Sequence, residues 1–369
     1  MSYFSHSPGR TSLRPRWFSV TTLFLLGCIL VFSSCSETDN THNKPFAYRT
    51  SSVSTLLQEQ SKLQMETLQQ WVALMQQYHG DTTSYQKDVL SDQKALHAAQ
   101  TDSAYQQVLD KLNQQVKNIE LPALKNEAST LEKQLAQEST AWGQKHTYHD
   151  SYNDTTYPLA YEYGSNGVDG FVQDDLSNAR TVSDYQQAVE DADMYLTNFH
   201  AYEANASDKT SWKQAHATDL QLLKHYNALN QKVVVISLGE ETMRVYQNGH
   251  LVKAFQVTTG QPAKPSLPGD WSVEEKQSPT VFRSDEPKSS PYWYPDTPIN
   301  YAMLYHSGGY FLHDSWWRDN YGFGTQFPHA DSSGDSFSYT GSHGCINIQE
   351  SNAAWLYSFV DVNTPVIIY

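Results

Sequence analysis

The chain has 369 residues, enough for two domains, and 40 acidic against 25 basic side chains give it a net charge of −15. This charge disfavours nucleic-acid binding, which depends on clustered lysine and arginine. The aromatic content of 13% suits surfaces that recognise sugars or peptides, although aromatic side chains more often belong to strand faces and the core.

Residues 1–35 predict an export signal. A segment with three arginines and no acidic residue precedes the mostly apolar stretch 17–32, and two serines and Cys35 follow. This order of basic, apolar and small residues is typical of a secretory signal. The apolar stretch is slightly shorter than the roughly 20 residues of a full membrane span.

The position of Cys35 after two serines resembles a bacterial lipobox. The cysteine of a lipobox is lipidated and becomes the mature N-terminus, so we expect lipidation at Cys35. Two alternatives remain, namely an uncleaved membrane anchor and lipidation of Cys28. All three place residues 40–369 in the cell envelope outside the membrane, and the polar segment 36–50 serves as a tether.

Residues 51–230 predict a helical spacer domain. Apolar residues recur at steps of three and four, which is the spacing of one helix face: Leu68, Trp71, Met75 and Tyr78, then Tyr105, Val108, Leu112, Val116 and Ile119. Turns are expected near Gly80 and Pro122, so the pattern indicates an antiparallel bundle or coiled-coil hairpin. The histidines of segment 146–180 lack ligand spacing, and no metal site is predicted there.

From Lys232 the pattern changes to that of strands. Alternating apolar residues predict strands, with a tight hairpin at Asn248-Gly249; the expected strands are 233–238, 242–246, 251–259, 271–273, 309–313 and 365–369, and a helix is expected at 350–359. Residues 232–369 therefore predict a compact, mostly β domain. The fold class expected for the whole chain is α+β, with a helical region followed by this domain.

The chemistry is concentrated in the six residues Ser342-His343-Gly344-Cys345-Ile346-Asn347. A thiolate is a strong nucleophile, and a neighbouring imidazole favours its formation. Gly344 allows close approach of the backbone, so the amides of Gly344 and Cys345 are candidates for an oxyanion hole. A polar segment of this kind is a poor core segment, which argues against a merely structural cysteine.

The β domain resembles the L,D-transpeptidase (YkuD-type) catalytic domain. The resemblance rests on the hairpin at Asn248-Gly249, the Thr-Gly-x-Pro stretch within 259–269, His313 after an apolar strand, and the motif 342–347. It covers residues 232–369 only. It implies a sandwich-like fold, and an enzyme that joins peptidoglycan stem peptides by 3→3 cross-links and is inhibited by carbapenem-type β-lactams.

The resemblance also implies a role for each motif residue. Cys345 would be the nucleophile, His313 the general base, and the backbone carbonyl of Asp314 would orient the imidazole of His313. His343 would shape the surroundings of the cysteine, Ser342 would have an orienting role, and Asn347 would support the motif loop. The chemistry requires no cofactor, and a single thiolate with scattered histidines lacks the spacing of a zinc site.

One departure from the family is the long insert between His313 and the motif. In the family the histidine lies closer to the motif, whereas residues 314–341 intervene here. The segment 316–340 is expected to be a lid or substrate wall, with Trp316, Trp317 and Arg318 as candidate contacts. His329 lies within it and is a rival general base, but its turn-like surroundings favour His313. For Trp316, Trp317 and Arg318, the alternative to substrate contact is ordinary packing within the insert.

Two other function classes stay open. The same fold with water as acceptor would be an L,D-carboxypeptidase or a hydrolase that cleaves cross-links. The third is a wall-binding lipoprotein without catalysis, against which the intact Cys345, His313 and His343 argue. The expected partners are therefore peptidoglycan stem peptides and, through the N-terminus, the membrane.

Overall fold

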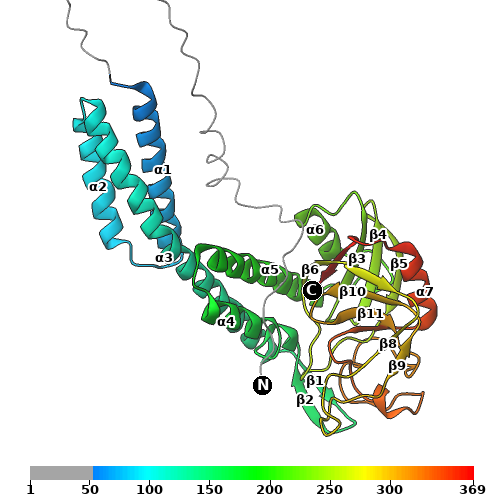
Figure 1. The fold of residues 1–369 in the computed structure, drawn as a ribbon. Helices are drawn as coiled ribbons and strands as arrows, with labels where there is room; N and C mark the ends of the chain where they lie inside the picture. Colours follow the sequence, from blue (N-terminus) through cyan, green and yellow to red (C-terminus); the bar gives the residue numbers. More distant parts are fainter. Residues whose placement is uncertain (1–52) are drawn as a thin grey trace, which may run out of the picture. The chain divides into compact units, whose positions relative to one another are not determined.

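The computed structural model describes residues 53–369, so the predicted signal, the tether, Cys28 and Cys35 lie outside the described residues. The described chain divides into two compact units, residues 53–127 and residues 128–369 (Figure 1). Residues predicted as spacer thus fall into both units. Within residues 53–369, no helix is both long and apolar enough to cross a membrane.

The first unit consists of helices. It contains α1 (Thr55–Gln77), α2 (Thr83–Ala98) and the first part of α3 (Asp102–Gly143). The apolar stripes predicted from the sequence provide much of its core, which includes Leu68, Trp71, Met75, Leu112, Val116 and Ile119. The turn expected near Gly80 is confirmed, because α1 ends before it and α2 begins after it.

The second turn, expected at Pro122, was wrong. Pro122 lies inside α3, which continues without a break to Gly143. Proline removes one helical hydrogen bond and costs about 3 kcal/mol in a helix interior. Here Ile119, Ala123 and Leu124 are fully buried on both sides of the proline, and their burial offsets this cost.

Short elements follow α3 in the second unit. They are the hairpin β1 (Thr147–Asp150) and β2 (Thr155–Pro158), the 3₁₀ turn η1 (Tyr161–Tyr163), and the helices α4 (Val168–Asn178), α5 (Val182–Ala206) and α6 (Ala217–His225). A capping box between Thr181 and Asp184 fixes the start of α5. The helices α4, α5 and α6 agree with the helical character expected for residues 51–230, whereas the hairpin was not predicted.

The C-terminal part is a β-sandwich, as predicted. Its larger sheet has the order β5-β4-β3-β13-β6, formed by β3 (Lys232–Ser237), β4 (Thr242–Gln247), β5 (His250–Gln256), β6 (Gly269–Ser272) and β13 (Pro365–Ile368). Asn248 and Gly249 both have positive φ, 50° and 73°. This is the backbone of a tight hairpin turn, so the predicted turn is confirmed.

The second sheet carries the functional motif. Its order is β12-β11-β10-β7, and its strands are β7 (Glu275–Gln277), β10 (Ala302–His306), β11 (Tyr310–Asp314) and β12 (Ile346–Ile348). A separate pair joins β8 (Thr280–Phe282) to β9 (Thr297–Ile299), the turn η2 spans Ser336–Ser338, and α7 (Glu350–Phe359) follows β12. Strands β11 and β12 run parallel, which brings the predicted histidine next to the cysteine motif.

Helices α5 and α6 are bound to the sandwich by buried polar groups. Arg244 on β4 is fully buried, and its guanidinium donates two hydrogen bonds to the carboxylate of Asp219 on α6. The hydroxyls of Tyr246 and Tyr369 also donate to Asp219. From α5, the Asn198 amide donates to the carbonyl of Ile368 at 2.8 Å. The helices α5 and α6 therefore supply hydrogen-bond partners to buried polar groups of the sandwich.

Candidate active site

Cys345 lies immediately before β12 and is partly exposed. It is the free cysteine of the described residues. Its Sγ donates a weak hydrogen bond to the carbonyl of Gly309, at 3.6 Å. Desolvation by burial raises the pKa of the thiol to about 11. The resting side chain at neutral pH is therefore a thiol, and a base must remove its proton during reaction.

His313 on β11 is buried, with 3% of its surface exposed. Its Nδ1 lies 2.7 Å from the carbonyl oxygen of Asp314. A carbonyl only accepts, so Nδ1 carries the proton and Nε2 has a free lone pair in the neutral ring. Burial lowers the pKa of His313 to about 4, against the smaller opposing effect of the Asp314 hydrogen bond. The imidazole is therefore neutral at physiological pH.

The parallel pairing of β11 and β12 places thiol and imidazole on one face. His313 is opposite Asn347, and Leu312 is opposite Ile346. Side chains alternate along a strand, and Cys345 lies two residues before Asn347, next to the first residue of β12, so this alternation favours the face of Asn347 and His313 for the thiol. The Asn347 amide donates to Nε2 of His313 at 3.1 Å. For proton transfer, the thiol must leave Gly309 and replace this amide at Nε2.

Ser342 closes the motif loop on itself. Its hydroxyl donates to the carbonyl of Cys345 at 2.5 Å and accepts the amide of Gly344 at 3.1 Å. The Gly344 amide must therefore exchange this bond before it can serve in an oxyanion hole. Gly344 has a φ of 111°, and a Cβ there would lie 2.7 Å from the ring of Tyr310. Only glycine satisfies both constraints.

Tyrosines surround the thiol, and sequence reasoning did not single them out. Burial, followed by the charge of an ionised Cys345, raises the pKa of Tyr294 and of Tyr310 to about 12. Tyr292 and Tyr294 also lie against the imidazole of His343, with ring centroids 5.8 and 5.7 Å away. The aromatic run at 292–294 between prolines was the available sequence signal.

His343 in the motif loop keeps an exposed surface. Partial desolvation of its ring by the neighbouring groups, followed by the charge of Lys264, lowers its pKa, while Glu286 acts in the opposite sense. Lys264 and Glu286 form an ion pair at 3.1 Å. The role expected for His343 in shaping the surroundings of Cys345 stays a prediction.

The three candidate lid residues have different surroundings. Trp316 is exposed, and its indole donates to the carbonyl of Pro298. Trp317 packs against His313, with ring centroids 6.0 Å apart. Arg318 is buried, with 3% of its surface exposed, and donates to the carbonyl of Thr340, which is the packing role given above as its alternative. It stabilises the insert from within, because its guanidinium joins the two ends of the segment.

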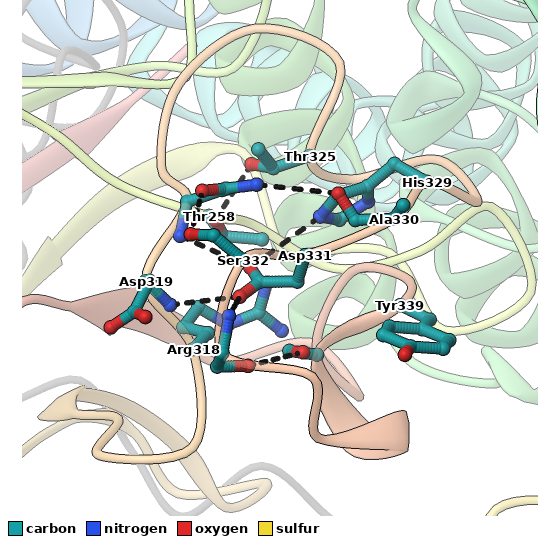
Figure 2. A network of polar contacts seen from close by, with 12 residues as sticks. Thr258, Arg318, Asp319, Thr325, His329, Ala330, Asp331, Ser332 and Tyr339 are labelled. Carbon is teal, nitrogen blue, oxygen red and sulfur yellow. Dashed lines mark hydrogen bonds and ion pairs between the residues drawn. The ribbon is translucent and has the colours of Figure 1, made fainter.

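Asp331 organises the middle of the insert, as Figure 2 shows. Its carboxylate accepts the backbone amides of Asp319 and Asn320, each at 3.0 Å, and the amide of Ser333 at 2.8 Å. The imidazole of His329 lies 3.7 Å from the same carboxylate, and its Nδ1 contacts the carbonyl of Phe327. Both ring nitrogens of this rival base thus face groups of the insert.

The family model for the L,D-transpeptidase catalytic domain, YkuD, matches residues 231–368. The L,D-transpeptidase 1 of Mycobacterium tuberculosis is 26% identical to this chain over 150 residues, which are 40% of this chain and 53% of the relative. The L,D-transpeptidase 2 of the same species is 25% identical over 37% of this chain and 30% of the relative.

The chain is also similar to solved structures of L,D-transpeptidases. A crystal structure of an Enterococcus faecium L,D-transpeptidase mutant is 26% identical over 38% of this chain and 50% of its own, with a TM-score of 0.31. An L,D-transpeptidase in complex with imipenem is 26% identical over 38% of this chain and 59% of its own, with a TM-score of 0.32. This chain spans about half the length of the first relatives it matches.

Proposed function

We propose that this protein is an L,D-transpeptidase that forms 3→3 cross-links in peptidoglycan through an acyl-enzyme on Cys345. The observation that carries the proposal is the pairing of β11 with β12 within a YkuD domain. This pairing sets a nucleophile and a neutral imidazole with an unprotonated Nε2 on one face. A cysteine beside an oriented base is the arrangement of nucleophilic catalysis.

The first half-reaction forms the acyl-enzyme. The thiol transfers its proton to Nε2 of His313 while Sγ bonds to the carbonyl carbon of the third residue of a stem tetrapeptide. The Asp314 carbonyl stabilises the imidazolium through Nδ1. When the tetrahedral intermediate collapses, the bond to the terminal D-alanine breaks, and the departing amine takes the proton from His313. A thioester on Cys345 and free D-alanine result.

The second half-reaction transfers the acyl group to an amine. An amine of a second stem peptide attacks the thioester, gives its proton to His313, and releases the thiol with that proton. The product is the 3→3 cross-link. Water in place of the amine would give a shortened stem peptide instead, so the acceptor decides between transpeptidase and carboxypeptidase.

The experiment uses the mature full-length chain and its Cys345→Ala variant. Intact mass after incubation with imipenem should show one adduct on the native chain and none on the variant. Products of incubation with a disaccharide tetrapeptide, analysed by mass spectrometry, should contain cross-linked dimers. Adducts that persist in Cys345→Ala would contradict the nucleophile, and shortened monomers without dimers would establish the carboxypeptidase.

We also propose that the enzyme works in the cell envelope, anchored to the membrane through a lipid on Cys35. The basic and apolar order of residues 1–32 supports export, and Cys35 follows at the position of a lipobox cysteine. A membrane-anchored catalytic domain would meet its substrate in the adjoining wall.

A further inference from the structure

A short backbone segment outside the motif, residues 258–261, holds the motif loop at both ends; we name it the support strip. At one end, the Ser342 amide donates to the carbonyl of Thr259 at 2.8 Å. At the other end, Thr258 and Asn347 exchange two backbone hydrogen bonds, at 3.0 and 2.8 Å. The position of the loop that carries the thiol therefore depends on the position of this strip.

Tyr161 reaches the support strip from outside the YkuD domain. It lies in η1, and its hydroxyl donates to the carbonyl of Gly260 at 2.6 Å. Burial raises the pKa of Tyr161 well above its usual value, so the hydroxyl stays protonated and remains a donor. The backbone approaches closely at Gly260, since a Cβ there would lie 2.3 Å from the carbonyl oxygen of Lys264, so only glycine fits this position.

The ring of Tyr161 is held by an aromatic cluster around Phe327 of the insert. Phe327 is fully buried. Tyr148 and Tyr157 of the β1–β2 hairpin stack on it, with centroids 4.5 and 5.1 Å away, and Tyr161 contacts its edge at 5.7 Å. Such contacts stabilise the arrangement of the rings beyond the effect of burial. Tyr161 is thus held in place by Phe327 of the insert as well as by its hydrogen bond to the support strip.

The strip is also anchored from the sandwich. The carboxylate of Glu241, fully buried at the β3–β4 turn, accepts the amide and the hydroxyl of Thr259. The hydroxyl of Ser266 accepts the Gly260 amide at 2.9 Å. Glu241 and Ser266 thus hold the amides of Thr259 and Gly260, and Tyr161 binds the carbonyl of Gly260.

We propose that Tyr161 is a positioning residue that sets the support strip, and through it the loop that carries Cys345, in the geometry for acyl transfer. This inference rests on the proposed function for its catalytic consequence. Tyr161 touches neither thiol nor imidazole through any contact in residues 53–369. It acts through backbone hydrogen bonds that also orient Ser342, on which the amide of Gly344 depends.

The test compares Tyr161→Phe with Tyr157→Phe in the mature full-length chain. Both changes remove one hydroxyl from a ring that packs on Phe327, but of these two tyrosines it is Tyr161 whose hydroxyl donates to the support strip. Imipenem acylation of Cys345 should slow at least about tenfold in Tyr161→Phe, since small misplacements of a catalytic group have effects of this size. Alkylation by iodoacetamide, which needs no oxyanion hole, should stay within about twofold of the native rate.

Tyr157→Phe should leave both rates within about twofold of native. Equal slowing of acylation and alkylation in Tyr161→Phe would indicate general loosening and overturn the positioning role, as would native acylation in this variant. Rescue of a slowed rate by high imipenem concentration would also overturn it, because positioning acts on the maximal acylation rate rather than on affinity.

A second measurement does not depend on the proposed function. Hydrogen exchange by mass spectrometry should show faster exchange in peptides that cover 258–261 and 341–347, by about tenfold in Tyr161→Phe, and no change in Tyr157→Phe. Native exchange in Tyr161→Phe would overturn the inference. If the native chain itself formed no imipenem adduct, the proposed function would fail, while the exchange comparison would still decide the role of Tyr161.

Discussion

Nε2 of His313 accepts a hydrogen bond from the side-chain amide of Asn347 across the paired strands β11 and β12, with 3.1 Å between the nitrogens. In the proposed reaction this lone pair also takes the proton of Cys345, because the Nδ1 proton is bound to the Asp314 carbonyl. The proposal therefore gives Asn347 two effects: its amide orients the imidazole at rest and competes with the thiol for Nε2.

The pH dependence of acylation should show this neutral base. Burial lowers the pKa of His313 to about 4 from its ordinary value of 6.5. The ring therefore takes up a proton only at a lower pH than a free histidine, and it remains neutral and able to accept a proton as the pH falls toward 5. The rate of imipenem adduct formation should fall on the acid side with a midpoint near 4, with folding checked by circular dichroism. A midpoint between 6 and 7 would contradict the assignment.

Asn347→Asp should move this acid limb to higher pH. A carboxylate beside the ring stabilises the imidazolium and raises the pKa of His313, typically by one to three units for a neighbouring opposite charge. The measurement is the same pH profile. Asn248→Asp, at the exposed β4–β5 turn, is the control and should leave the limb unchanged. An unshifted limb in Asn347→Asp would show that His313 is not the titrating base.

The two candidate bases can be separated by substitution. His313→Ala should lower the acylation rate at least about a hundredfold, the scale of lost general-base assistance. His329→Ala should cost less than about tenfold, because its ring faces Asp331 and the Phe327 carbonyl. Pseudo-first-order adduct formation on folded variants decides the question. The opposite ranking would assign the base to the insert.

The buried pair of Asp219 and Arg244 should matter for stability. Asp219→Asn leaves the fully buried guanidinium without its main counter-charge, so the free energy of unfolding should fall by about 3 kcal/mol or more. Asp296→Asn breaks an exposed pair with Arg283 and should cost less than about 1 kcal/mol. Urea unfolding of both variants measures the difference. Equal costs would contradict the dominance of the buried pair.

Lipidation can be assigned by serine substitutions at the two N-terminal cysteines. Cys35→Ser should abolish incorporation of a labelled fatty acid, because the thiol is the site of attachment, whereas Cys28→Ser should retain it. Label that persists in Cys35→Ser and disappears in Cys28→Ser would move the lipid to Cys28. Absence of label in the native chain would favour an uncleaved anchor.

The sequence predicted those parts of the fold whose signals are local. The helix at 350–359 agrees with α7, and the Asn248-Gly249 turn joins β4 to β5. Strands β7, β8, β9 and β12 are only three residues long, too short for alternation to be visible. Pro122 misled because tertiary burial outweighed a local preference.

For the site, the sequence motif predicted Cys345 as the nucleophile, and the strand before the insert predicted His313 as the base. The residues that surround these two could not be predicted. The contact of Asn347 with His313 depends on a parallel pairing between strands distant in sequence, which no local pattern encodes. The burial of Arg318 depends likewise on how the insert folds around Asp331. Tyr161 escaped notice because it belongs to a region with no catalytic motif.

Asp219 has a practical consequence for protein engineering. A chimaera that exchanged only residues 231–368 would separate Arg244 from the carboxylate on α6 that neutralises it. It would also remove the acceptor of the Tyr246 hydroxyl. A domain exchange therefore has to include α6. If the recipient protein keeps its own helix there, that helix must carry an aspartate or glutamate at the position equivalent to Asp219.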